Sequence, residues 1–325
     1  MRQRASFIAP LLLAIFAQPA LAFDCGKAKT EVEKAICASP DLKALDNDLA
    51  AAYADVKAAL PPAEQKMLVR SQRRWIARRE NCGEAEEGVS ACITGCMKDR
   101  LSLLSGRPES GPGADGQLLP QFIVQDGTAK SYDLNLAVLR FTDPQTPGEK
   151  TLNQLADKVL RAAKLGPHGE DTEGSVYADE EIWSLTYASP EFISVRSDYY
   201  EDRGGAHGMY GTMNINIDMA TGKQLILADV LTEPSAAILA LECRRQILAE
   251  KQRRLQKAGD NDPVTLDDAA VAEQVRNLAS WSIGAKDIIV SFDPYVVGSY
   301  AEGAYTCSFP TAGVKKLAQP GASIP

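Results

Sequence analysis

The stretch Ser-Gly-Arg-Pro-Glu-Ser-Gly-Pro-Gly-Ala-Asp-Gly-Gln, residues 105–117, separates two parts of the chain that differ in pattern. It is rich in glycine, proline and serine and has no apolar periodicity, which is typical of a linker between domains. The pattern is helical before this stretch and changes to strands and mixed elements after it. A chain of 325 residues is long enough for about two domains. We therefore predict one domain at residues 23–104 and a second at residues 118–325.

The part before the linker predicts a small all-α domain with four helices. Thr30-Glu31-Val32-Glu33 is a capping-box pattern that begins a short helix, and Ser39-Pro40 begins a second one. Apolar residues then follow at three- and four-residue steps and form one stripe, namely Leu42, Leu45, Leu49, Ala52, Val56 and Leu60. Pro61-Pro62 ends this helix and begins a third, and residues 91–104 form the last.

The part after the linker predicts an α+β domain with an antiparallel sheet. Strand patterns span residues 132–141, 182–187, 192–200, 210–219, 281–283, 288–292 and 305–309. Helical patterns span residues 152–165, 235–258 and 266–279. Antiparallel strands with segregated helices are typical of the α+β class. We expect the last three strands to close the same sheet as the earlier ones.

The start of the chain predicts export. Arg2 and Arg4 form a basic region, Phe7–Ala17 is apolar, and Ala20-Leu21-Ala22 fits a cleavage site, so residues 1–22 read as a secretory signal peptide. The apolar stretch is too short to span a bilayer comfortably, and no later segment approaches twenty apolar residues. We expect a soluble mature protein in the periplasm or outside the cell, without a transmembrane segment.

The charge of the chain is acidic and unevenly distributed. Removal of Arg2 and Arg4 with the signal peptide changes the formal net charge from −8 to −10. Residues 23–104 carry 13 basic and 13 acidic residues, so the whole excess lies in the second half. This balance argues against a general nucleic-acid binder, which would show a basic excess.

The cysteines are expected to form disulfides because the compartment is oxidising. Five of the seven fall early, namely Cys25, Cys37, Cys82, Cys92 and Cys96. The second and third helices must run antiparallel, so these cysteines can cluster at one end, and two bonds with open connectivity are expected. Cys96 is our candidate for the odd thiol, and Cys243 is expected to pair with Cys307. No C-x-x-C spacing is present, so a zinc ribbon is not supported, and the Cys92/Cys96 spacing is only a weak metal signal.

The first part carries a specific set of motifs: residues 23–28, 32–37 and 42–46 with Tyr53, the string Gln72-x-x-Trp75-x-x-x-Arg79-Glu80-x-Cys82, and the closing Cys92, Arg100 and Leu104. With these motifs it resembles the LprI-type lysozyme-inhibitor N-terminal domain. The chain departs from the family pattern at Cys96, and at Met97, where an aromatic residue is expected. The resemblance implies an exported helical domain, linked in some members to inhibition of lysozyme, and it implies no catalytic residues.

For Trp75 and the arginines of the third helix, we favour a structural role over a role in binding a partner. Trp75 is expected to lie in the core beside the cysteine end rather than to contact a partner. The helix also carries the cluster Arg70, Arg73, Arg74, Arg78 and Arg79, of which Arg70, Arg74 and Arg78 share one face. We expect a solvated face paired with Glu64 and Glu80, in preference to a site for an acidic partner.

Three segments of the second part, residues 199–208, 216–225 and 292–303, carry glycine-rich and tyrosine-rich motifs in register. They resemble the RsiV-type C-terminal domain, which also occurs beside peptidoglycan deacetylases of the PdaC type, and residues 119–165 look like the small domain that precedes it. The resemblance implies an exported binding domain, with lysozyme recognition known in the family. The deacetylase catalytic domain is absent from this sequence.

Two loops of the second part are candidates for partner binding. Glycine-framed loops that carry tyrosines and acids are typical of recognition surfaces. The first candidate set is Tyr199, Tyr200, Glu201, Asp202, His207 and Tyr210, and the second is Tyr295, Tyr300 and Glu302. One histidine with loop carboxylates is a poor set of transition-metal ligands, and no motif places a nucleophile beside His207. Ordering of the glycine-rich turn by His207 is favoured over direct contact with a partner. We expect no metal, no cofactor and no catalytic residue.

These observations predict a binding protein rather than an enzyme. The favoured function is lysozyme binding or inhibition that protects the cell wall, because both parts resemble domains associated with lysozyme. The charge is compatible with this, since an acidic domain would attract a basic lysozyme. The alternative is an envelope-stress or peptidoglycan-binding module without inhibitory action. A third interpretation is a hydrolase that uses the acids around His207.

Overall fold

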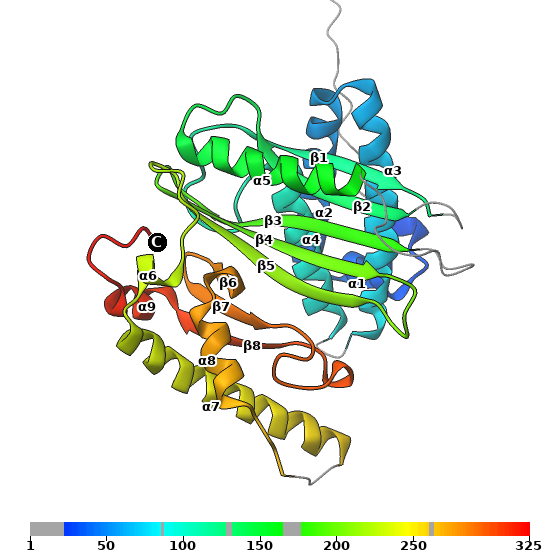
Figure 1. Cartoon of the computed structure of the whole chain (residues 1–325). Helices are drawn as coiled ribbons and strands as arrows, with labels where there is room; N and C mark the ends of the chain where they lie inside the picture. Colours follow the sequence, from blue (N-terminus) through cyan, green and yellow to red (C-terminus); the bar gives the residue numbers. More distant parts are fainter. Residues whose placement is uncertain (1–22, 86–87, 128–131, 165–176, 260–262) are drawn as a thin grey trace, which may run out of the picture.

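The structure is a computed structural model that describes residues 23–85, 88–127, 132–164, 177–259 and 263–325 (Figure 1). It contains a helical module, a central five-stranded sheet and a C-terminal unit with a three-stranded sheet. This agrees with the predicted fold class, a disulfide-stapled helical part followed by an α+β part. The predicted signal peptide lies outside the described residues.

The helical module begins with the short 3-10 helix Cys25–Lys27 and contains four α-helices. These are α1 (Glu31–Ala38), α2 (Pro40–Ala59), α3 (Pro62–Arg79) and α4 (Val89–Ser105). The predicted capping box is present, since the Thr30 side chain accepts from Glu33 N and the Glu33 carboxylate accepts from Thr30 N. Most of the predicted stripe on α2 is buried, with Leu42 at 3% exposure and Val56 at 3%.

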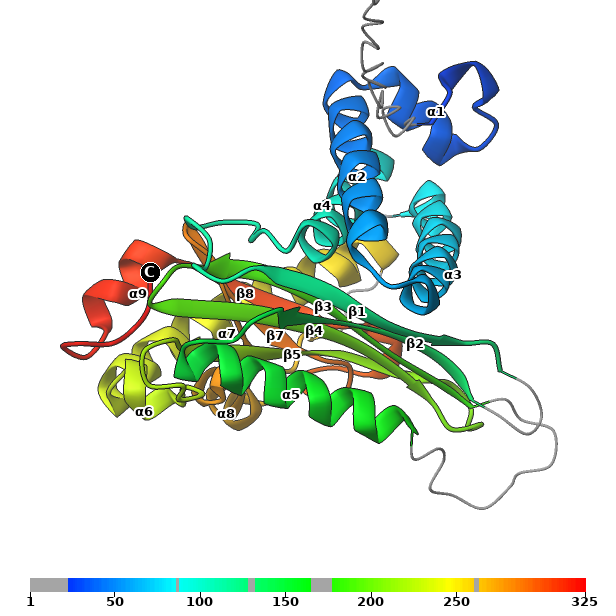
Figure 2. The same ribbon diagram turned by 90° about the horizontal axis from the view of Figure 1, so that it is seen from above.

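The central sheet has the strand order β1-β2-β3-β4-β5. Its strands are β1 (Leu118–Gln125), β2 (Asp133–Phe141), β3 (Ala178–Ala188), β4 (Phe192–Asp202) and β5 (Met209–Asp218). The β2–β3 pair is parallel, and the connection between these strands contains α5 (Pro147–Lys164), so the sheet is mixed rather than purely antiparallel. The helical module covers one face of this sheet and α5 covers the other (Figure 2).

The C-terminal unit has its own core. Its sheet is formed by β6 (Trp281–Ile283), β7 (Asp287–Phe292) and β8 (Tyr305–Pro310), and its helices are α6 (Leu227–Val230), α7 (Glu233–Ala258), α8 (Asp268–Arg276) and α9 (Thr311–Leu317). The prediction that these strands close the central sheet is wrong. They pair only with one another, because their apolar faces pack against α7 and α8 in a separate cluster that contains Trp281 and Phe292.

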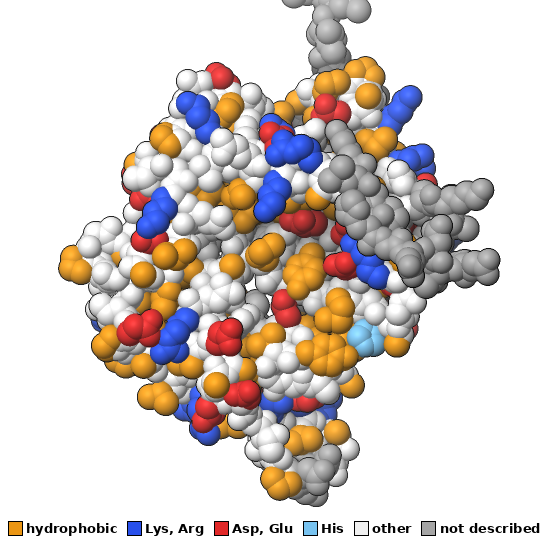
Figure 3. Space-filling model, viewed as in Figure 1, with side chains coloured by type: hydrophobic (Ala, Val, Ile, Leu, Met, Phe, Trp, Pro, Cys, Tyr) orange, Lys and Arg blue, Asp and Glu red, His pale blue; other side chains and the backbone are white. Residues whose placement is uncertain are grey.

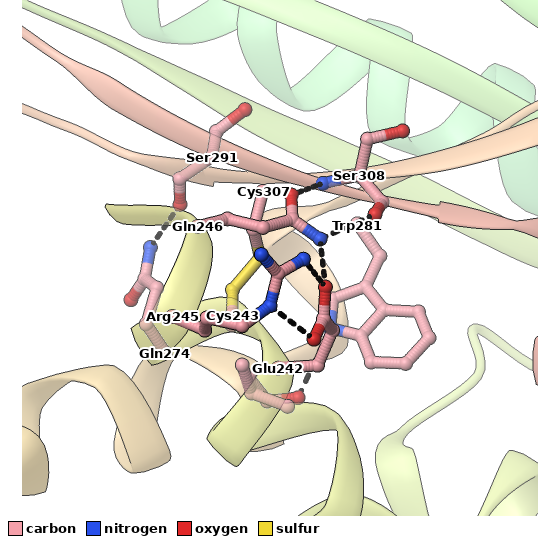
Figure 4. Close-up of a disulfide and its surroundings, with 10 residues drawn as sticks. Glu242, Cys243, Arg245, Gln246, Gln274, Trp281, Ser291, Cys307 and Ser308 are labelled. Atoms are coloured by element: carbon pink, nitrogen blue, oxygen red, sulfur yellow. Dashed lines mark hydrogen bonds and ion pairs between the residues drawn. A yellow bond between two sulfur atoms is a disulfide. The ribbon is translucent and has the colours of Figure 1, made fainter. Parts of the chain in front are cut away.

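Three disulfides connect neighbouring elements. Cys25–Cys37 and Cys82–Cys92 are the two bonds expected in the helical module, and Cys243–Cys307 joins α7 to β8 with a Cα–Cα distance of 5.2 Å (Figure 4). Cys96 forms none of these bonds. Burial raises the pKa of the Cys96 thiol to about 11, so it is a weak nucleophile at neutral pH.

The arginine face of α3 binds the central sheet, so the expected solvated face is wrong for Arg70, Arg74 and Arg78. Within the described residues, the expected pairing with Glu80 is confirmed only for Arg79, at 3.7 Å. Arg70 donates to Val124 O at 3.4 Å, Arg74 pairs with Asp126 and Asp133, and Arg78 pairs with Glu180. Successive turns of one helix therefore contact β1, β2 and β3 in order. The helical module and the sheet also share one buried cluster, so the two parts form a common core.

Residues 106–117, which we call the connecting segment, run along the end of β3. Glu109 N donates to Leu185 O at 2.8 Å and Gly113 N donates to Ala188 O at 3.0 Å. β2 pairs with β3 only as far as Ile182, so this segment bonds to the part of β3 beyond it. The predicted domain boundaries stay predictions, but the segment has hydrogen bonds that an unattached linker would lack.

Three carboxyl groups surround one arginine where the helical module meets the sheet. Arg196 on β4 pairs with Asp99 of α4 at 2.8 Å and with Asp198 at 3.0 Å. Glu109 hydrogen-bonds to Asp99, and Lys98 adds a second positive charge nearby. Burial, together with the like charge of Asp99, raises the pKa of Glu109 to about 7.

Because its pKa is raised, Glu109 is predicted to make the folded state more stable at acidic pH than at neutral pH. The folded state binds more protons than the unfolded state between the ordinary glutamate pKa and about 7, so the stabilisation is complete below that range and is lost as the pH rises through 7. Between pH 5 and pH 8, the free energy of unfolding in urea should fall by about 1 kcal/mol more in the parent protein than in Glu109→Gln. The expected difference is this small because solvent screening reduces the effect. Parallel pH profiles of the two proteins would contradict this assignment.

Candidate functional site

The candidate site lies where loops from the two sheets meet. Residues 203–208 connect β4 to β5, and residues 293–304 connect β7 to β8. Tyr300 Oη donates to Gly208 O at 2.8 Å, which joins the two loops directly. Tyr300 also meets Tyr210 edge to face, with ring centroids 5.8 Å apart. Four predicted residues are brought together here, and we call them the aromatic cluster: His207, Tyr210, Tyr295 and Tyr300.

His207 is the centre of the aromatic cluster. Its ring stacks on Tyr300 with centroids 3.7 Å apart and an interplanar angle of 22°. Nδ1 lies 3.0 Å from Gly208 O and Nε2 lies 3.2 Å from Tyr295 Oη. A carbonyl only accepts, so we assign the proton to Nδ1, which leaves Nε2 to accept from Tyr295. His207 thus binds both its own glycine-rich turn and the opposite loop.

Tyr295 has the most unusual backbone in the cluster. It is the one residue other than glycine with a positive φ in the described part of the chain, at 73°, and it is 57% exposed. Such a conformation costs about 1–3 kcal/mol and occurs mainly where structure or function requires it. A strained backbone that presents a large ring to solvent is consistent with a recognition surface.

Asp293 fixes the second loop to the edge of the central sheet, and our sequence interpretation missed it. Its Oδ1 accepts from Thr212 N at 3.0 Å and its Oδ2 accepts from Tyr199 Oη at 3.3 Å. Burial raises the pKa of Asp293, and the neighbouring Asp198 adds to this rise. A Cβ at Gly211 would lie 2.2 Å from Asp293 Oδ2, so glycine is required there. The Gly211 position within a strand was the available signal.

Glu302 holds its loop in place through internal contacts, and its part in partner binding stays a prediction. Its carboxylate binds Lys251 at 2.5 Å, Tyr305 Oη at 2.8 Å and Ser299 N at 2.7 Å. Burial raises the pKa of Glu302, but the hydrogen bonds from Lys251 and Ser299 outweigh this and lower it to about 2. The carboxylate is therefore charged at neutral pH and fully used in internal contacts.

The acids of the first loop are also engaged. Glu201 pairs with Arg203 at 2.6 Å, and Asp202 accepts from Gly204 N at 2.8 Å and from Tyr200 Oη at 3.3 Å. Tyr199 lies on the opposite face of β4 from Tyr200, because successive side chains of a strand alternate. The site therefore presents aromatic rings together with partly exposed carboxylates that are already engaged in ion pairs and hydrogen bonds.

The wider surface carries mixed charge. On the coloured part of the face in Figure 3, acidic and basic side chains are interspersed among hydrophobic ones. Within the described residues, no group of three or more His, Cys, Asp or Glu side chains is arranged to hold a metal ion. Of the helices that the structure describes, none has the length and apolar character needed to cross a membrane.

Comparison with known proteins separates the chain into two matched regions. Residues 25–103 match a family described as "Lysozyme inhibitor LprI", and residues 228–312 match one described as "Protein of unknown function (DUF3298)". The first region coincides with the helical module and the second with most of the C-terminal unit. The resemblance to RsiV-type and PdaC-type proteins stays a prediction.

Two solved structures of the DUF3298 family are similar to this chain at 17% sequence identity. One, from Bacteroides fragilis, has a TM-score of 0.42, and the alignment covers 64% of this chain and 96% of that one. The other, from Pseudomonas aeruginosa, has a TM-score of 0.44, with 66% of this chain and 100% of that one covered. No curated protein matches this chain.

Proposed function

We propose that this chain is an exported lysozyme-binding protein that inhibits lysozyme and thereby protects the cell wall. The observation that carries the proposal is the match of residues 25–103 to a lysozyme-inhibitor family, over a helical module whose four α-helices and two disulfides are all present. The disulfides support an exported protein, because such bonds persist in oxidising compartments.

The protein acts in this proposal by binding and not by catalysis. The exposed part of the candidate site includes aromatic rings, and its carboxylates are engaged in ion pairs and hydrogen bonds within the protein. The formal net charge of −8 favours encounter with a basic partner such as a lysozyme.

The proposal is tested by a lysis assay. Purified residues 23–325, with disulfides intact, are mixed with a basic lysozyme before bacterial cell walls are added. We expect the fall in turbidity to slow in proportion to the added protein, up to a one-to-one ratio. The same protein after reduction and alkylation under denaturing conditions is the control and should have no effect. Lysis at an unchanged rate in the presence of the folded protein would reject inhibition.

A second candidate function is suggested by the aromatic cluster alone. Exposed tyrosine rings provide apolar faces with polar tips, which suit contact with sugar rings. A protein that binds peptidoglycan without inhibiting lysozyme should sediment with insoluble peptidoglycan, and Tyr295→Ala should lose this association. Retention of the parent protein in the supernatant would reject this alternative.

A further inference from the structure

Five of the six arginines of the helical module are used in internal contacts. Arg70, Arg74 and Arg78 bind the central sheet, as described above. Arg79 and Arg100 are buried, at 6% and 4% exposure, and lie against the Trp75 ring. The module carries 13 basic and 13 acidic residues, so its solvent-facing surface is more acidic than this balance indicates.

The outer face of α2 carries part of this acidic surface. Asp41, Asp48 and Asp55 recur every seven residues, which places them along one side of the helix. All three are exposed, and within the described residues none takes part in an ion pair or a side-chain hydrogen bond. These carboxylates differ in this respect from the acids around the aromatic cluster.

A groove runs beside this face, between α2, α4 and the connecting segment. Its volume is about 880 Å³. Much of its surface is apolar, formed by Leu45, Ala52, Val56, Leu104, Leu118 and Leu119. The α2 wall carries Asp48 and Asp55, whereas the opposite wall carries Lys98, Arg107 and Glu109. The groove therefore combines an apolar floor with an α2 wall whose two charged residues are both acidic.

We propose that this groove is the docking surface for a basic lysozyme, which inserts lysine or arginine side chains along the α2 wall. This inference rests on the proposed function and adds the surface at which it operates. The long stem of a lysine or arginine is apolar and its head is cationic, so it fits an apolar floor that ends at free carboxylates. The positive charges of Lys98 and Arg107 repel the lysine and arginine heads of the partner, which therefore bind on the α2 side of the groove.

The test compares two variants that remove the same charge from different places. Asp48→Asn/Asp55→Asn removes two charges from the groove, and Glu273→Gln/Asp287→Asn removes two exposed charges from the C-terminal unit. Binding of immobilised lysozyme by the full mature chain is measured by surface plasmon resonance at low salt. We expect the dissociation constant to rise about tenfold or more for the groove variant and less than about twofold for the control. Melting curves confirm that both variants fold.

The outcomes are distinguishable. If the parent chain binds lysozyme and both variants weaken binding equally, attraction is general rather than local, and the groove is rejected while the proposed function stands. Unchanged binding by the groove variant would also reject the groove and leave the proposed function standing. If light scattering shows a dimer that only the groove variant dissociates, the occupant is a second copy of this chain, which overturns the proposal. Failure of the folded parent to bind lysozyme rejects the proposed function itself.

Discussion

Replacing Cys243 and Cys307 together by alanine is expected to lower the free energy of unfolding of the C-terminal unit by about 4 kcal/mol, because their bond closes a long loop. The two cysteines are 64 residues apart, whereas the bonds of the helical module span 12 and 10 residues and should each contribute about 3 kcal/mol. The bond also joins α7 to β8 inside the C-terminal core, where both cysteines are buried.

The hydrogen bonds beside this disulfide stabilise the contact between α7 and β8 less than the disulfide does. The Gln246 side chain accepts from Ser308 N at 2.9 Å and donates to Ser308 O at 3.0 Å, so α7 is also attached to β8 by hydrogen bonds (Figure 4). Each such bond contributes about 1 kcal/mol, less than the disulfide. Urea unfolding followed by tryptophan fluorescence measures the change, since Trp281 lies in this core. Cys96→Ser is the control and should change stability by less than about 1 kcal/mol; an equal loss in both variants would contradict the account.

Trp75→Ala is expected to destabilise the helical module by about 3–4 kcal/mol and, with it, to abolish binding of lysozyme. Arg79 and Arg100 lie over the Trp75 ring, with guanidinium carbons 5.1 Å and 5.9 Å from its centroid. Arg100 has no carboxylate partner among the described residues, and burial lowers its pKa to about 9. The Trp75 ring therefore contributes to the stabilisation of both buried cations. Arg79 also pairs with Asp46 and Glu80, at 3.8 Å and 3.7 Å, and Arg100 also lies over the Phe122 ring.

Trp75→Phe is the matched control, because it keeps a ring between the two arginines. We expect Trp75→Phe to lower the free energy of unfolding by about half as much as Trp75→Ala does. The readout is the thermal unfolding of the full mature chain, together with lysozyme binding below the melting temperature. Equal stability of Trp75→Ala and the parent would show that the tryptophan does not support the module.

The helices of the module could be predicted because their signals are local. Thr30 and Glu33 form the expected capping box, and Ser39 accepts from Leu42 N at the start of α2. The arginine face of α3 could not be interpreted correctly from its own sequence. The partners of Arg74 and Arg78 lie more than 50 residues further along the chain, at Asp126, Asp133 and Glu180.

Strand β1 was missed because Pro120 lies within it. Proline is rare in central strands but is tolerated at a sheet edge, and β1 is an edge strand. The separate sheet of the C-terminal unit was missed for a different reason. Alternating apolar residues show that β7 and β8 bury one face, but they do not show which layer covers it.

The candidate site was predicted in its residue types and not in its contacts. The sequence indicated two tyrosine-bearing loops, and the structure brings His207 and Tyr300 into a stack although they are 93 positions apart. Glu302 was chosen for its charge, but Lys251 on α7 engages that charge. Tertiary pairing of this kind depends on helix placement, which periodicity does not reveal.

The most direct test of a lysozyme-binding protein is a calorimetric titration of the folded mature chain, residues 23–325, with a basic lysozyme at low salt. The account predicts a saturable heat with one-to-one stoichiometry and an affinity that falls as salt is added, because charge contributes to the encounter. A folded chain that gives no binding heat at several temperatures, and that leaves lysozyme fully active at the same concentrations, would contradict the account.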